Sequence, residues 1–409
     1  MLAQIRRVGR YCLARRIRAA LPKLILQTAK ILVLIGHPQF CLGNQSVEVG
    51  LGPNDMPVCS RAYNRALALL SEKDFDGAIE EFGRAIDMKC NEPKLYAERA
   101  LAYLQSGQRE RALADYTRAV QADPQNADAY FDRGLVYAAV NQNKLAIDDF
   151  DSAIKINPKL ADAFASRAIA WASINNDRGA LADFGSAIAL DPKSAIYRNN
   201  RGRFYLLKGM IGQAIVDLTA AISLQSNFAD AFENRAAAYY QSHSYAAAIA
   251  DLDRLVLLRP NYAAAHLKRG MAFGKEGQHN LAIKDFDSAL QLDPTSVEAL
   301  NGRCWQRAIT NTDLSSALED CNLAVKLAPD NLAVLDSRGL VELLLGRFKD
   351  ALSDYDACVR HDPNAVKQLF ARGVAKLRLG DHTGRSDIAA ARKKDPRIYR
   401  EFAAYGIVP

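Results

Sequence analysis

Residues 127–160 read ADAYFDRGLVYAAVNQNKLAIDDFDSAIKINPKL and contain the pattern that decides the fold. Numbered from its first residue, the stretch has a small residue at position 8 (Gly134), alanines at positions 20 and 27, and a proline at position 32 (Pro158). Aromatic side chains stand at position 11 (Tyr137) and position 24 (Phe150). Positions 20, 24 and 27 lie along one stripe of a helix. A proline ends that helix, because the residue before a proline is pushed out of helical conformation. The stretch is therefore predicted to form a pair of antiparallel helices.

The same pattern recurs along most of the chain. The prolines that occupy position 32 are separated by 33, 34 or 35 residues, except for one gap of 68 in which Ser226 replaces a proline. A helix pair of this length cannot bury its apolar stripe alone, but stacked pairs bury one another's faces. The position-32 prolines are Pro124, Pro158, Pro192, Pro260, Pro294, Pro329, Pro363 and Pro396.

The repeat divides the chain into four parts. Residues 1–42 form a basic leader and residues 43–58 a linker; ten repeats are expected over 59–398, and a capping helix or tail over 399–409. The predicted fold class is all-α, and the predicted architecture is an α-solenoid.

The recurring small, aromatic and proline positions resemble the tetratricopeptide repeat, and the chain as a whole resembles exported bacterial proteins of that family. The resemblance implies a right-handed superhelix whose first helices line a concave groove, with positions 2, 5, 9, 12 and 13 facing into it. A peptide or partner protein is then expected in the groove; the alternative is that several of the large groove residues pack between neighbouring helices. The groove residues carried over in this way are Phe131, Leu135, Asn199, Arg203, Glu233, Tyr240, Trp305 and Phe370.

A charge pair travels with the repeat. Position 7 is arginine and position 23 is acidic in all ten repeats, as in Arg133 with Asp149 and Arg167 with Asp183. In an antiparallel helix pair position 7 lies opposite positions 23–25, so we expect an ion pair within each repeat or between adjacent repeats. We interpret them as structural ion pairs, because each arginine is accompanied by its own acid; a ladder of ligand-binding arginines is the alternative.

Charge and motifs argue against nucleic-acid binding and catalysis. The chain has a net charge of +7, and eight of its 53 basic residues precede the first acidic residue, Glu48. The rest of the chain therefore contains 45 basic and 46 acidic side chains. That near-neutral body has no basic field for a polyphosphate. The sequence contains no His-Glu-x-x-His, no Cys-x-x-Cys and no Walker-type phosphate loop. We therefore expect no enzymatic activity, no metal and no cofactor.

The cysteines fall into two classes. Cys59 and Cys90 stand at positions 1 and 32 of the first repeat, the two open ends of one helix pair, so an oxidising compartment would allow a disulfide between them. Two free thiols are the alternative. Cys304, Cys321 and Cys358 occupy core positions 8, 24 and 27, and we interpret them as small hydrophobic residues.

The leader suggests where the protein acts. It is basic, free of acidic residues and followed by a short apolar stretch, which resembles an export signal. The alternatives are an organellar presequence and an uncleaved amphipathic anchor. The sequence thus predicts an exported, periplasmic or envelope-associated interaction scaffold. The alternative function is a structural envelope protein that residues 1–42 hold at a membrane surface.

Overall fold

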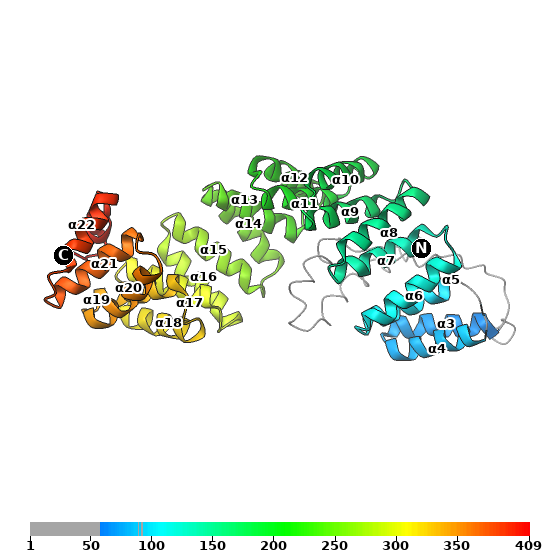
Figure 1. The fold of residues 1–409 in the computed structure, drawn as a ribbon, viewed down its shortest axis with the longest axis horizontal. Coiled ribbons are helices and arrows are strands. Elements are labelled where there is room, and N and C mark those ends of the chain that lie inside the picture. Colours follow the sequence, from blue (N-terminus) through cyan, green and yellow to red (C-terminus); the bar gives the residue numbers. More distant parts are fainter. Residues whose placement is uncertain (1–57, 89, 91–92) are drawn as a thin grey trace. The chain divides into compact units, whose positions relative to one another are not determined.

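A computed structural model describes residues 58–88, 90 and 93–409 (Figure 1). Within these residues the regular structure consists of 21 helices, and no strand is present. The prediction of an all-α solenoid of helix pairs is confirmed. The leader, residues 1–42, and the linker up to residue 57 lie outside the described residues.

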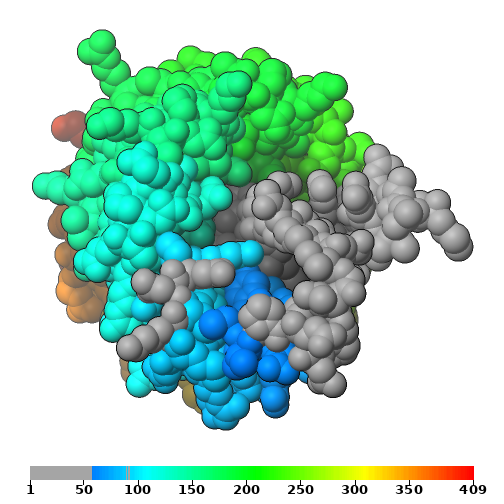
Figure 2. Space-filling view, turned by 90° about the vertical axis from the view of Figure 1, so that its right-hand side faces the viewer, coloured from blue at the N-terminus to red at the C-terminus, as the bar shows by residue number. Residues whose placement is uncertain are grey.

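The helices form two compact groups, which are described separately. In the N-terminal group, which ends at Lys208, helices pack in consecutive pairs along the chain, and Figure 2 shows part of the surface of this group, coloured from blue through cyan into green. Its helices are α3 (Val58–Glu72), α4 (Phe75–Asp87), α5 (Pro93–Gln105), α6 (Arg109–Ala122), α7 (Ala127–Ala139), α8 (Asn143–Ile156), α9 (Ala161–Ser173), α10 (Asp177–Leu190) and α11 (Ala195–Leu207).

The C-terminal group begins at Gly209, and its helices also pack in consecutive pairs along the chain. It ends in a single short helix, α23, that has no partner of its own repeat. Its helices are α12 (Ile211–Leu224), α13 (Ala229–Gln241), α14 (Tyr245–Leu258), α15 (Ala263–Lys275), α16 (His279–Leu292), α17 (Val297–Ile309), α18 (Leu314–Leu327), α19 (Leu332–Leu344), α20 (Phe348–His361), α21 (Val366–Arg378), α22 (Gly384–Lys394) and α23 (Ile398–Ala404).

Close packing between position 8 and position 24 holds each pair together. A Cβ atom added at Gly134 would lie 2.7 Å from the ring of Phe150 on the facing helix, and one added at Gly339 would lie 2.9 Å from the ring of Tyr355. Both rings are fully buried. The small residue is needed because the aromatic ring rests directly on the backbone of the first helix.

The turn inside a repeat uses a residue in the left-handed conformation. Gly107 (φ 82°) and Gly277 (φ 79°) take this place in two repeats, and Asn141 (φ 61°) takes it in a third. Glycine and asparagine tolerate positive φ with little strain, so they end the first helix and let the chain reverse into the second.

Two disulfides are present among the described residues. Cys59 and Cys90 form a disulfide, with Cα atoms 5.8 Å apart. It joins the first turn of α3 to Cys90, which follows the end of α4 at Asp87. Cys304 of α17 and Cys321 of α18 are also bonded, with the same Cα separation of 5.8 Å. The interpretation of these last two as small hydrophobic residues is corrected: positions 8 and 24 touch within a repeat, so two cysteines there are adjacent. Cys358 is free and buried.

Candidate functional site

The arginines at position 7 are bound inside the repeats. Arg133 donates from Nε and Nη2 to the two carboxylate oxygens of Asp149, at 2.8 and 2.7 Å, and Arg167 contacts Asp183 in the same way. The two side chains of the first pair are 16% and 7% exposed. The same two-point contact joins Arg99 to Asp115, Arg235 to Asp251, Arg269 to Asp285, Arg303 to Asp320, Arg338 to Asp354 and Arg372 to Asp387.

In seven of these eight arginines, all except Arg99, Nη1 reaches the preceding repeat. Nη1 of Arg269 donates to Asp253 at 2.8 Å, and Nη1 of Arg303 donates to Asp287 at 2.7 Å. The acceptor stands at position 25 of the preceding repeat, where Asp, Thr or Asn recurs, so the arginines pair both within a repeat and between adjacent repeats. Each such arginine therefore joins three helices, and its donors are used within the solenoid rather than offered to a ligand.

Half of the predicted groove residues lie in the core. Phe131 and Leu135 are each 6% exposed, Asn199 is 6% exposed and Phe370 is fully buried. In this structure they are covered from within the chain: Phe131 packs against Phe150 on the second helix of its own repeat, and Phe370 packs against Phe402 of residues 398–409. Contact of these four residues with a partner stays a prediction. The other four, Arg203, Glu233, Tyr240 and Trp305, are partly exposed.

Glu233 on α13 is already engaged by its neighbours. Its carboxylate accepts from Nζ of Lys268 at 2.5 Å and from the hydroxyl of Tyr262 at 3.1 Å. Burial, together with the charge of Glu233, raises the pKa of Tyr262 to about 12. On the same helix, the ring of Tyr240 meets that of Tyr245 edge-on at 5.3 Å. These two predicted groove residues thus belong to a preformed polar and aromatic surface.

The first helices of the N-terminal group carry an acidic cluster. Burial, together with the charges of the nearby carboxylates of Asp128 and Glu98, raises the pKa of Asp132 to about 8. Burial also raises the pKa of Glu98. Carboxyl groups this close resist simultaneous ionisation. Glu98 lies on α5 and Asp132 on α7, so their proximity arises only when two repeats stack.

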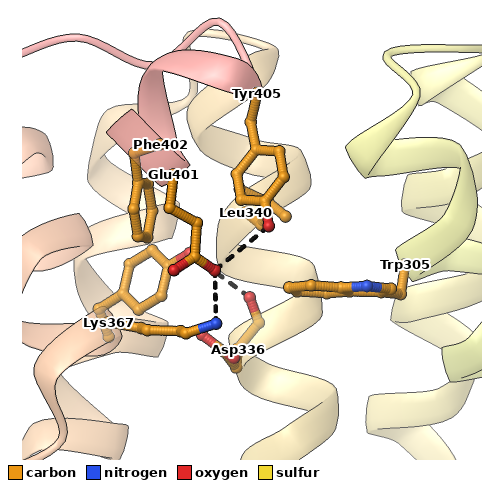
Figure 3. A pocket seen from close by; sticks show the side chains of 8 residues that line it. Trp305, Asp336, Leu340, Lys367, Glu401, Phe402 and Tyr405 are labelled. Atoms are coloured by element: carbon orange, nitrogen blue, oxygen red, sulfur yellow. Dashed lines mark hydrogen bonds and ion pairs between the residues drawn. The ribbon is translucent and has the colours of Figure 1, made fainter. Parts of the chain in front are cut away.

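A pocket in the C-terminal group brings predicted groove positions together with the end of the chain (Figure 3). Trp305 on α17, Leu340 on α19 and Lys367 on α21 come from three successive first helices. Glu401, Phe402 and Tyr405 close the pocket from the other side. We call the surface formed by Trp305, Asp336, Leu340, Lys367 and Phe370 the C-terminal site, and residues 398–409 the C-terminal segment.

Polar and aromatic contacts hold the segment at one edge of the site. Nζ of Lys367 forms an ion pair with Glu401, and the hydroxyl of Tyr405 donates to Glu401 at 3.3 Å. Burial and the charge of Glu401 raise the pKa of Tyr405 to about 12. The ring of Tyr405 stands edge-on to Trp305, with ring centroids 6.5 Å apart.

Apolar contacts hold the C-terminal segment at the other edge of the C-terminal site. The ring of Phe402 lies 4.8 Å from that of Phe370, and Ile407 is 6% exposed. After α23 the chain reverses at Gly406 (φ 82°), and Nη2 of Arg378 donates to the carbonyl oxygen of Val408 at 3.0 Å. The sequence predicted a cap on the last repeat; it did not predict that the segment reaches back as far as Trp305.

The last three repeats lack an aromatic residue at position 11, and polar contacts replace it in two of them. Arg307 pairs with Asp320 at 2.8 Å, and Lys376 pairs with Asp387 at 2.9 Å. In the third, Glu342 is 6% exposed and one of its carboxylate oxygens has no hydrogen-bond partner. Burial raises the pKa of Glu342 to about 7, and the charge of Asp354 acts in the same direction.

No group of three or more histidine, cysteine or acidic side chains among the described residues is arranged to hold a metal ion. None of the helices described is both long enough and apolar enough to cross a membrane.

Comparison with known families identifies the repeat. Residues 127–160 and 263–296 each match the family described as tetratricopeptide repeat, and residues 100–141 match a related family described as TPR repeat. The first of these segments carries the pattern of small, aromatic and proline residues that predicts the helix pair. No curated protein matches the sequence.

Solved structures of similar fold include PilF of Pseudomonas aeruginosa, which is 23% identical, aligns over 51% of this chain and 95% of its own, and gives a TM-score of 0.46. A tetratricopeptide repeat protein from Parabacteroides merdae is 18% identical, aligns over 60% of this chain and 97% of its own, and scores 0.49. YrrB, described as a TPR protein with an unusual peptide-binding site, is 20% identical, aligns over 55% and 97%, and scores 0.34. At these values we draw no functional argument from the likeness.

Proposed function

Because this chain is a tetratricopeptide repeat protein, we propose that it is a non-catalytic scaffold that binds a peptide or a partner protein along the first helices of its repeats. The observation that carries the proposal is the C-terminal site. There, side chains at groove positions hold a segment of chain outside the repeats through aromatic, ionic and backbone contacts. A surface that holds one segment in this way has the chemistry to hold another.

The near-neutral charge of the chain after the leader supports a protein partner rather than a nucleic acid. The internal pairing of the position-7 arginines supports the same choice, because it leaves no row of cationic groups for phosphates. The scaffold therefore works through shape and scattered polar contacts, without a cofactor.

We further propose that the protein acts outside the cytoplasm. The basic leader, with no acidic residue before Glu48, and two bonded cysteine pairs both favour export to an oxidising compartment. In the second candidate function, a structural envelope protein, the same leader holds the chain at a membrane surface. Cell fractionation of the full chain and of a variant lacking residues 1–57 separates the two: membrane association that survives the deletion counts against tethering by the leader.

Partner capture with matched variants tests the scaffold function. The full-length chain is compared with Tyr240→Ala and Trp305→Ala, which truncate partly exposed groove residues, and with Leu257→Ala, a change on second helix α14 at a side chain that is 71% exposed. Captured proteins are quantified by mass spectrometry. We expect partner yield to fall for at least one groove variant and to stay unchanged for Leu257→Ala. Equal capture by all four proteins would refute binding through the first helices.

A further inference from the structure

The C-terminal site is occupied by the C-terminal segment, and the contacts of that segment indicate which side chains the site can bind. We propose that it is the docking surface for a short amphipathic helix of another protein, one that carries a carboxylate followed by aromatic side chains one and four positions later. The C-terminal segment presents this pattern as Glu401, Phe402 and Tyr405, and occupies the site until the partner helix replaces it. The proposal rests on the scaffold function and names the partner class for one part of it.

The apolar half of the site selects the first aromatic residue. Phe402 is 5% exposed and its ring lies 4.8 Å from that of the fully buried Phe370. Leu340, which is 2% exposed, lines the same pocket. A buried aromatic anchor of this kind dominates the energetics of helix-in-groove recognition.

The polar half selects the carboxylate and the second aromatic residue. Lys367 and Glu401 are 53% and 30% exposed, so their ion pair stays in contact with water and exchanges readily. Asp336, whose pKa burial raises to about 6, also lines the pocket and disfavours a second acidic group there. Trp305 offers its edge to an aromatic side chain that follows the carboxylate by one helical turn, as Tyr405 does.

The C-terminal segment can detach from the C-terminal site while the repeats stay folded. α23 has seven residues, of which only Ile398 and Phe402 are buried, whereas α19 buries eight of its thirteen. A helix this short has little stability of its own. Tyr399 and Val408 of the C-terminal segment are already 42% and 43% exposed. Local opening of such an element belongs to the low-stability end of a folded protein.

The tether makes the segment a strong competitor in its own site. A short connection gives an effective concentration on the order of millimolar, so a free helix must displace it before binding. Weakening the segment's contacts should therefore increase the affinity of the site for the same helix added in trans. Changing the charge at Lys367 should change which helix is preferred.

A labelled peptide with the sequence of residues 396–409 is the probe, and binding to full-length protein is followed by fluorescence anisotropy. In the Glu401→Lys variant the attached segment is repelled by Lys367, and we expect the peptide to bind at least tenfold more tightly than to the unmodified chain. Tyr405→Ala provides a second variant that weakens the segment without a charge change. Thermal unfolding by circular dichroism verifies that both variants are folded. Unchanged affinity in both folded variants overturns the proposal.

A charge exchange tests the specificity of the site. Lys367→Glu protein should prefer a peptide carrying Glu401→Lys over the unmodified peptide by at least tenfold, and Glu401→Lys protein should show the opposite preference. Loss of this reciprocity overturns the assignment of Lys367 as the carboxylate-selecting group.

Two further outcomes separate this proposal from the others. A dimer of the unmodified chain that the peptide dissociates would identify a second copy as the occupant and overturn the assignment to another protein. Partner capture that depends on Tyr240, together with no peptide binding to any variant, would overturn the proposal and leave the scaffold function intact.

Discussion

Removing the guanidinium of Arg133 tests how far the arginine pairs stabilise the solenoid. In the Arg133→Met variant, the carboxylate of Asp149 loses two hydrogen bonds of 2.8 and 2.7 Å while only 7% of that side chain is exposed to water. Leaving a buried charge without its partner costs about 3–5 kcal/mol. We expect a loss in that range, because water reaches Asp149 too little to replace the arginine.

The assay must report on one repeat, since stacked repeats open locally and the whole chain does not unfold in a single step. Native-state hydrogen exchange of α7 and α8 amides measures their opening free energy directly. A loss of 3–5 kcal/mol accelerates exchange through opening by a factor between about 10² and 4 × 10³, at 1.4 kcal/mol per tenfold.

Two control variants sharpen the result. Glu80→Gln removes one partner of an exposed pair, Glu80 with Arg84, whose side chains are 66% and 52% exposed, and should cost less than about 1 kcal/mol. The double variant Arg133→Met/Asp149→Leu removes both charges and should recover most of the loss. If Arg133→Met changes exchange no more than Glu80→Gln does, or if the double variant is as unstable as the single one, the buried-pair reasoning is refuted.

Three further predictions concern other contacts. Glu342→Gln should leave stability near pH 4.5 unchanged and raise the melting temperature above pH 7. The reason is that the raised pKa of Glu342 makes folding of the unmodified chain less favourable as pH rises from about 4.5 to about 7. A series of thermal melts at different pH values checks this. Cys304→Ala/Cys321→Ala should make exchange in α17 and α18 insensitive to reductant, whereas in the unmodified chain reductant should lower their stability by about 3 kcal/mol. Gly134→Val should destabilise α7 and α8 by about 1–3 kcal/mol in the same exchange assay, since its Cβ would lie 2.7 Å from the ring of Phe150.

Some of the missed contacts were within reach of the sequence. Gly134 and Phe150 already indicated that positions 8 and 24 meet, and the same rule applied to Cys304 and Cys321 predicts their bond. The recurring polar residue at position 25, such as Asp253, was a comparable signal for the third contact of the arginines. Both follow from the repeat geometry once the contact between two positions is known in a single repeat.

The sequence by itself determined that this protein is a solenoid of helix pairs, because the spacing of small, aromatic and proline residues acts within one repeat and recurs in the next. Only the tertiary structure decided which groove positions stay accessible. Leu135 and Trp305 both stand at position 9 of first helices, yet Leu135 is buried in the core of its group and Trp305 faces Tyr405. Helical periodicity fixes the face of a helix on which a side chain lies. The distance to the neighbouring helix, and the segment of chain that returns to cover that face, depend on packing between residues far apart in the sequence.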